Sequence, residues 1–121
     1  MTEKPRLYPG PDHPITVTPT GKRVVVTAGG RVVADTRDAL TLQEASYPAV
    51  QYVPLADVDR SLLERTGTES YCPFKGEASY YTLAVNGAEN ADAAWYYPDP
   101  KPRAVTVKDR VAFWNGVEIT A

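Results

Sequence analysis

The chain of 121 residues has the length of one domain, and its 43% hydrophobic and 23% charged residues are ordinary for a globular protein. A net charge of −2 gives no general attraction to nucleic acid or to an anionic membrane surface. A single cysteine excludes an internal disulfide and a four-cysteine zinc site, and no apolar run approaches the roughly 20 residues that would span a membrane. The N-terminal residues lack the apolar core of a signal peptide, so we expect a cytoplasmic protein that binds neither nucleic acid nor membranes.

The first residues, 1–14, are predicted to form an extended, Pro-rich lead-in to the domain. Four prolines in this stretch keep it out of a helix. It contains the only histidine, His13, whose side chain titrates near neutral pH and would serve as an acid/base or ligand-binding group. In a Pro-rich surface arm His13 can equally be structural or solvated, and both interpretations stay open.

Short β-strands account for much of the chain that follows. Residues 15–18 alternate apolar and polar side chains, as a half-buried strand does. Two β-branched runs, residues 22–27 and 31–35, are joined by Gly29-Gly30, a common two-residue hairpin connection. Residues 36–47 fit either a strand or a short capped helix.

The middle of the chain supplies one strand, one helical segment and one candidate acid. Residues 50–53 predict a strand that Pro54 stops, and residues 56–64 carry apolar side chains at helical spacing, which predicts a short helical segment. Glu44 precedes the aromatic-proline pair Tyr47-Pro48. It would act there as a general base or a ligand clamp, or it is a carboxylate on the surface.

The sequence Cys72-Pro73-Phe74-Lys75, followed by Gly76, is the stretch richest in reactive side chains. Pro73 suits the second position of a β-turn, and such a turn brings Cys72 and Lys75 side by side. A neighbouring ammonium favours the thiolate, so Lys75 would activate Cys72 as a nucleophile, or it would bind a carboxylate or phosphate. The alternatives are a small buried Cys72 and a solvated Lys75.

Further hairpins are predicted toward the C-terminus. Residues 78–85 and 93–97 predict two strands joined at an Asn-Gly pair, which favours a type I′ turn. Residues 104–107 fit a strand or a short turn. Residues 111–114 and 117–119 predict a third hairpin around a second Asn-Gly pair.

Aromatic side chains gather on the first of these hairpins. If its strands pair, Tyr80 or Tyr81 lies across from Trp95 or Tyr97, close to Asp99. Trp95 and Tyr97 share one face of their strand because side chains alternate. Such residues are either part of the core or the lining of a small-ligand pocket.

Together these elements predict a mainly β fold: a small single domain over residues 1–121, made of short antiparallel hairpins with one or two short helical turns. The chain also resembles a bacterial and fungal family, the domain of unknown function family four-two-seven, which is sometimes labelled nucleotidyltransferase-like. The pattern Cys-Pro-x-Lys-Gly-x-Ala-x-Tyr is its most specific part. The segments that carry the resemblance are residues 9–15, 72–80, 93–100 and 111–113.

The resemblance implies bent, tent-like sheets, similar to folds that elsewhere carry a structural zinc. This chain lacks the paired cysteines, so we predict no zinc and no other metal. The resemblance implies no established reaction. The nucleotidyltransferase label finds no support in these residues, because neither a paired-carboxylate metal site nor a phosphate-binding loop is present.

Two hypotheses of different classes follow for the function. The first is a small-molecule binding domain with a pocket at the Cys-Pro-Phe-Lys-Gly motif, suited to a polar or anionic metabolite and without a cofactor. Its catalytic version would use Cys72, Lys75 and Glu44. The candidate ligand-binding residues are Lys75, Tyr80, Trp95, Tyr97, Asp99 and His13.

The second hypothesis is a non-catalytic module for protein interaction or homo-oligomerisation. It would present the Pro-rich arm and residues 98–102 as a rigid surface to another protein or to a second copy of the chain.

Overall fold

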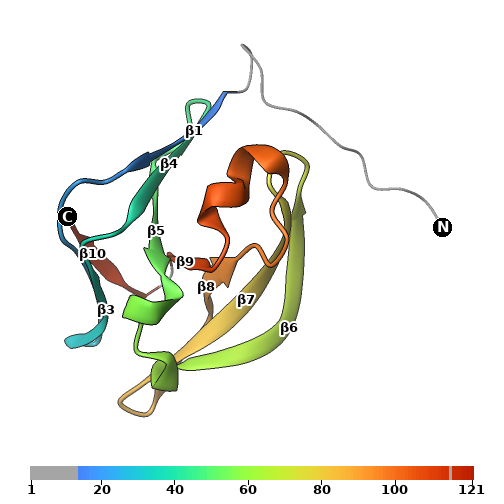
Figure 1. Ribbon diagram of the computed structural model, residues 1–121. Coiled ribbons are helices and arrows are strands. Elements are labelled where there is room, and N and C mark those ends of the chain that lie inside the picture. The colour runs from blue at the N-terminus through green and yellow to red at the C-terminus, as the bar shows by residue number, and fades with distance from the viewer. Residues whose placement is uncertain (1–13, 115) are drawn as a thin grey trace.

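The chain folds into two antiparallel β-sheets, drawn in Figure 1. The computed structural model describes residues 14–114 and 116–121. The larger sheet has seven strands in the order β1-β4-β5-β9-β8-β7-β6, and the smaller has three in the order β10-β2-β3. The strands are β1 Ile15–Pro19, β2 Val24–Ala28, β3 Arg31–Thr36, β4 Leu40–Glu44, β5 Val50–Pro54, β6 Leu63–Cys72, β7 Gly76–Val85, β8 Ala88–Tyr96, β9 Arg110–Phe113 and β10 Glu118–Thr120. The described residues also form three 3-10 helices: η1 Leu55–Asp57, η2 Arg60–Leu62 and η3 Pro102–Val107.

The mainly β, hairpin-rich prediction is confirmed, and two of the predicted hairpins are present. β2 pairs with β3 across Gly29-Gly30. β7 pairs with β8 across Asn86-Gly87, both of which have the positive φ that a type I′ turn requires. The register places Tyr80 opposite Trp95, which is one of the cross-strand pairings that alternation predicted.

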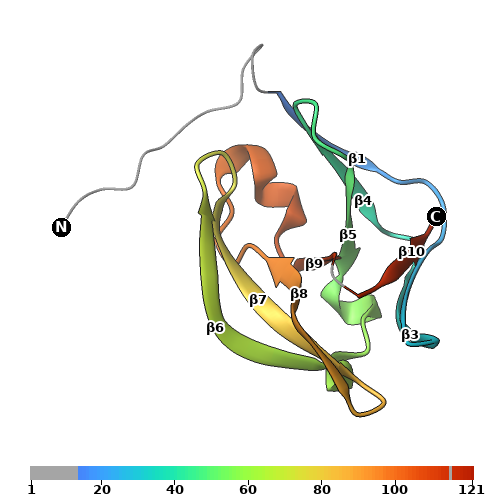
Figure 2. The same cartoon turned by 180° about the vertical axis from the view of Figure 1, so that it is seen from behind.

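The seven-stranded sheet bends at its short central strand. β9 pairs through two residues with β5 and through two with β8, so little backbone pairing joins the two halves. In both views β1, β4 and β5 form one wall and β6 and β7 another, with η3 between them (Figures 1 and 2). The β4–β5 and β6–β7 loops and η3 lie at the same end of the molecule (Figure 1).

Two hydrophobic clusters fill the interior. The first lies under the three-stranded sheet and includes the fully buried Val24, Val26 and Leu83. The second lies between the walls and includes Tyr52 and Tyr97, with η3 contributing buried side chains. The second cluster therefore sits beneath the loops at the end of the molecule where β6 and β7 meet.

In parts of the C-terminal half of the chain, the structure differs from what the local sequence patterns predict. The helical segment expected over residues 56–64 is reduced to η1 and η2, and Asp59 caps η2 by accepting a hydrogen bond from the Ser61 amide. The chain then enters β6, a ten-residue strand that was not predicted. The expected hairpin of residues 111–114 and 117–119 is wrong, because β9 pairs with β5 and β8 while β10 pairs with β2.

Burial explains this last error. Val111, Ala112 and Phe113 are all buried, so β9 is a central strand with neighbours on both sides and has no free edge for β10. The two segments with open alternatives are also decided: residues 36–47 contain the strand β4, and residues 104–107 belong to η3.

Candidate functional site

The Cys-Pro-Phe-Lys sequence forms the predicted turn at the tip of the β6–β7 hairpin. The amide of Lys75 donates to the Cys72 carbonyl at 3.2 Å, which closes the turn. Gly76 then takes a φ of +115°, a conformation that side chains disfavour, and a Cβ there would lie 3.3 Å from the Asp99 carbonyl oxygen. The Lys101 amide also donates to the Lys75 carbonyl at 2.9 Å. The turn is thus fixed against the segment that leads into η3.

An ion pair joins this turn to the opposite wall of the sheet. The Nζ atom of Lys75 donates to Oε1 of Glu44, the last residue of β4. Only 14% of the Lys75 side chain and 9% of the Glu44 side chain is exposed, so both charges lie largely out of water. Both residues are sequence-predicted candidates, but their separation of 31 residues along the chain gave no signal that they pair.

Aromatic rings line the interior beside the ion pair. Lys75 Nζ lies 5.8 Å from the centroid of the Tyr97 ring, within the range of a cation–π contact. Tyr52 is fully buried, and Trp95 meets it edge-on at 6.4 Å while donating its indole N–H to the Tyr52 hydroxyl at 3.2 Å. Tyr80 is partly buried against the same cluster, and its hydroxyl lies 2.8 Å from the Ser70 hydroxyl.

The protonation states follow from this packing. Burial raises the pKa of Tyr52 and of Tyr97, which therefore remain neutral phenols at physiological pH. Burial lowers the pKa of Lys75, but the hydrogen bond and charge of Glu44, with a further contribution from Tyr52, outweigh it, and the net pKa is raised. Lys75 is consequently a permanent cation near neutral pH, suited to holding an anionic group and unsuited to acting as a base.

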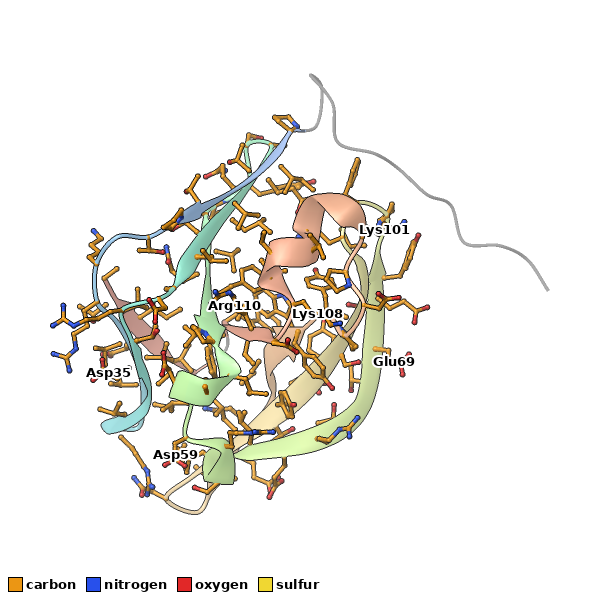
Figure 3. All side chains as sticks on the ribbon, viewed as in Figure 1. Asp35, Asp59, Glu69, Lys101, Lys108 and Arg110 are labelled. Carbon is orange, nitrogen blue, oxygen red and sulfur yellow. The ribbon has the colours of Figure 1, made fainter. Side chains whose placement is uncertain are left out.

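A second lysine stabilises the same loop. Lys101 Nζ donates to the Tyr71 hydroxyl and to the Pro73 carbonyl, both at 2.8 Å, and lies 5.0 Å from the centroid of the Tyr71 ring. Figure 3 shows Lys101 at the end of the molecule where β6 and β7 meet. Sequence analysis did not include Lys101, Tyr71 or Tyr52 in the site. Tyr71 directly precedes Cys72, so its place in the sequence could have included it, whereas Tyr52 on β5 and Lys101 before η3 are brought there by tertiary contacts.

The remaining predicted residues fall in different places. Cys72 is partly buried against the second cluster. The Asp99 side chain is exposed, and what approaches the turn is its backbone carbonyl. His13 and the rest of the Pro-rich arm up to it lie outside the described residues. The assigned roles of all these residues, and the interaction-module hypothesis that depends on the arm, stay predictions.

A cleft of about 480 Å³ lies elsewhere, at the turn between β2 and β3 and the start of β10. It is lined by Thr27, Gly29, Gly30, Gly116, Val117 and Glu118. It offers one charged side chain beside glycine backbone, whereas the Lys75–Glu44 pair combines two opposite charges with phenols and an indole. The ion pair is therefore the stronger candidate.

Metal binding and membrane insertion also bear on the function. Within residues 14–114 and 116–121, no three His, Cys, Asp or Glu side chains gather in a way that could hold a metal ion. No helix among the residues that the structure describes is long and apolar enough to cross a membrane.

Comparison with known protein families gives a match over most of the chain. A family model described as "Domain of unknown function (DUF427)" matches residues 16–120, which is most of the chain. The match includes Glu44, the Cys-Pro-Phe-Lys-Gly motif and the aromatic strand β8. No curated protein matches the chain.

Proposed function

The chain belongs to the DUF427 family, and on that premise we propose that it binds a small polar or anionic metabolite at the Lys75–Glu44 ion pair. The neutral phenol of Tyr97 and the indole of Trp95 provide the neighbouring aromatic surface. Lys75 supplies the charge that attracts an anionic group, and the tyrosine hydroxyls supply hydrogen bonds that orient the ligand.

The observation that carries the proposal is an ion pair largely removed from water. Desolvating a carboxylate and an ammonium offsets much of their attraction, so apolar residues at the same positions would often stabilise a fold as well or better. Charged groups held in such surroundings are common at functional sites, where burial and neighbouring charges adapt them to binding or catalysis. The pair also joins the end of β4 to the β6–β7 turn, at the loop end of the molecule (Figure 1).

Binding without catalysis is the form that the geometry favours. Glu44 already engages the ammonium of Lys75, which weakens the field that this ammonium exerts on Cys72. If Lys75 does act on the thiol, freeing it by Glu44→Gln should speed alkylation of Cys72 in the folded protein, and Lys75→Met should slow it. Equal rates of iodoacetamide labelling in all three proteins would exclude a Lys75-activated nucleophile.

The binding proposal is tested by thermal denaturation with a ligand panel. Dicarboxylic acids, inorganic phosphate, nucleoside monophosphates, amino acids and monosaccharides cover the relevant charge classes. A ligand at about a hundred times its Kd stabilises the folded state by about 2.7 kcal/mol, which for 121 residues corresponds to about 10 °C in Tm. We expect at least one class to produce such a shift.

Two variants make the result specific to the site. Lys75→Met should abolish the ligand-dependent shift, whereas Lys108→Met, which removes the same charge from an exposed position, should retain it. The double variant Glu44→Leu/Lys75→Met removes both charges together and serves if the single variant is unstable. A panel without any shift, or a full shift retained in the double variant, would contradict the proposal.

A further inference from the structure

A second candidate site lies apart from the Lys75–Glu44 pair, in the cleft of about 480 Å³ between the β2–β3 turn and the start of β10. We propose that this cleft binds a small primary alkylammonium ion, a binding site beyond the proposed function. β3 and β10 lie on the side of the molecule away from β6 (Figures 1 and 2). The volume falls within the range of roughly 300–1,000 Å³ that is typical of cavities for small ligands.

The charge in the cleft comes from the carboxylate of Glu118, the first residue of β10. Glu118 is exposed, and no cation among the described residues pairs with its carboxylate. The basic residue beside the β2–β3 turn, Arg31, is engaged elsewhere, because its guanidinium lies 3.2 Å from the Asp59 carboxylate. A cationic ligand would therefore meet a carboxylate for which no described side chain competes.

A hydroxyl group lies next to this carboxylate. Thr27 on β2 pairs directly with Glu118 on β10, so the two side chains project from the same face of the three-stranded sheet. Both line the cleft, together with the exposed Gly29 and Gly30, which have no side chain to cover their backbone. A primary ammonium has three N–H donors, which can be given to the carboxylate, to the hydroxyl, and to a backbone carbonyl or water.

The same lining disfavours ligands of other charge. An anion would approach Glu118 with no described cation paired there to offset the repulsion. A calcium ion requires about six to eight oxygen ligands, and within residues 14–114 and 116–121 no three His, Cys, Asp or Glu side chains gather in a way that could hold a metal. A single organic cation matches the single carboxylate of the cleft.

Apolar side chains beside the cleft indicate an alkyl stem. Val117 lines the cleft and packs against the first hydrophobic cluster. Val32 on β3 is the cross-strand partner of Thr27 on the other side and is 51% exposed. Glu118, Thr27 and Val32 thus form a row across three strands, whose spacing is about 4.8 Å. An unbranched stem of about six carbons reaches from an ammonium at Glu118 to the Val32 side chain.

The experiment titrates hexylammonium into the full-length ¹⁵N-labelled protein and follows the amide signals of Gly29, Gly30 and Gly116 by NMR. One charge-assisted contact and a short apolar stem correspond to a Kd on the order of 1 mM, which such a titration measures directly. Two probes with the same stem test the head group: hexyltrimethylammonium keeps the charge without an N–H donor, and hexanol lacks the charge. We expect both to bind at least about 10-fold more weakly.

Variants then assign the contacts of the ligand. Glu118→Gln should weaken binding of hexylammonium at least about 10-fold, and Thr27→Val about 2- to 10-fold. The matched control is Glu69→Gln, which removes an exposed carboxylate from β6, on the far wall (Figure 3), and should leave the Kd unchanged. Val32→Ser should weaken hexylammonium but not propylammonium, whose stem is too short to reach that side chain.

The outcomes also separate the cleft from the ion pair. Binding that is lost in Glu118→Gln and retained in Glu44→Leu/Lys75→Met would support the proposal. Loss of binding in that double variant would overturn it, because the ligand would then occupy the ion pair. Equal affinity for hexanol, equal affinity in Glu118→Gln, or no saturable shift of the glycine amides up to about 10 mM would overturn it as well.

Discussion

Removing the charge of Lys75 is the most direct test of the structural basis of this site. Lys75→Met keeps the apolar stem and deletes the ammonium, so the Glu44 carboxylate, 9% exposed, loses its ion pair with Lys75. Breaking a buried pair in this way typically costs about 3–5 kcal/mol. With roughly 2.1 cal/mol/K of unfolding entropy per residue, 1 kcal/mol corresponds to about 4 °C in this 121-residue chain, so we expect Tm to fall by about 12–20 °C.

The assay is thermal and urea denaturation of four proteins: wild type, Lys75→Met, Glu44→Leu and the double variant. The double variant should recover most of the loss, because replacing both charges by apolar groups is often neutral or stabilising by about 1–4 kcal/mol. Arg23→Met provides the matched control, since Arg23 pairs with Asp35 at a site where both side chains are about half exposed. Its Tm should barely change.

A drop of less than about 4 °C in Lys75→Met would refute this reasoning. It would mean that water reaches Glu44 freely and that the pair behaves as an exposed one. A double variant as unstable as the single variant would refute it in a different way, because the cost would then not come from separating the two charges.

Two other predictions concern the turn and the buried phenols. Gly76→Ala should lower the free energy of unfolding, measured with urea, by about 1–3 kcal/mol, because a φ of +115° strains any side chain. Gly67→Ala, where an added Cβ meets open space, should lower it clearly less. Equal losses in the two variants would contradict the role of the turn. Because burial raises the pKa of Tyr52 and of Tyr97, the folded protein keeps protons that unfolded phenols release near pH 10, so stability should be constant below about that pH and fall as pH rises through it. Absorbance titration at about 295 nm should show that both phenols remain protonated at about pH 10 to 11. The Tyr52→Phe/Tyr97→Phe variant should therefore show the same change in absorbance as the wild type in that range, and a smaller change would contradict the raised pKa values.

Local sequence patterns were sufficient where one turn decides the structure. Gly29-Gly30 and Asn86-Gly87 each specify a tight turn between runs of β-formers, and both hairpins are present. The Cys72–Lys75 turn is likewise present because Pro73 fixes its own φ and Gly76 can adopt the positive φ that follows the turn. The residues that specify these three turns lie in or next to the turns themselves.

The same patterns failed where long-range pairing decides the structure. The residues of β6 carry few apolar side chains and include Gly67, so they resemble a loop until β7 provides a partner along much of their length. The segment of residues 111–119 resembles a hairpin, yet burial on both sides directs β9 to the centre of one sheet and β10 to the edge of the other.

The sequence by itself determined the class of fold, the main turns and the residue types of the candidate site, because turn geometry and side-chain alternation are local properties of the backbone. Only the tertiary structure decided that Lys75 pairs with Glu44 and lies over Tyr97, and that Lys101 supports the same loop. The physical reason is the bend at β9, which brings together two walls that are far apart along the chain. Lys75 and Glu44 are removed from water and placed side by side only because these walls meet.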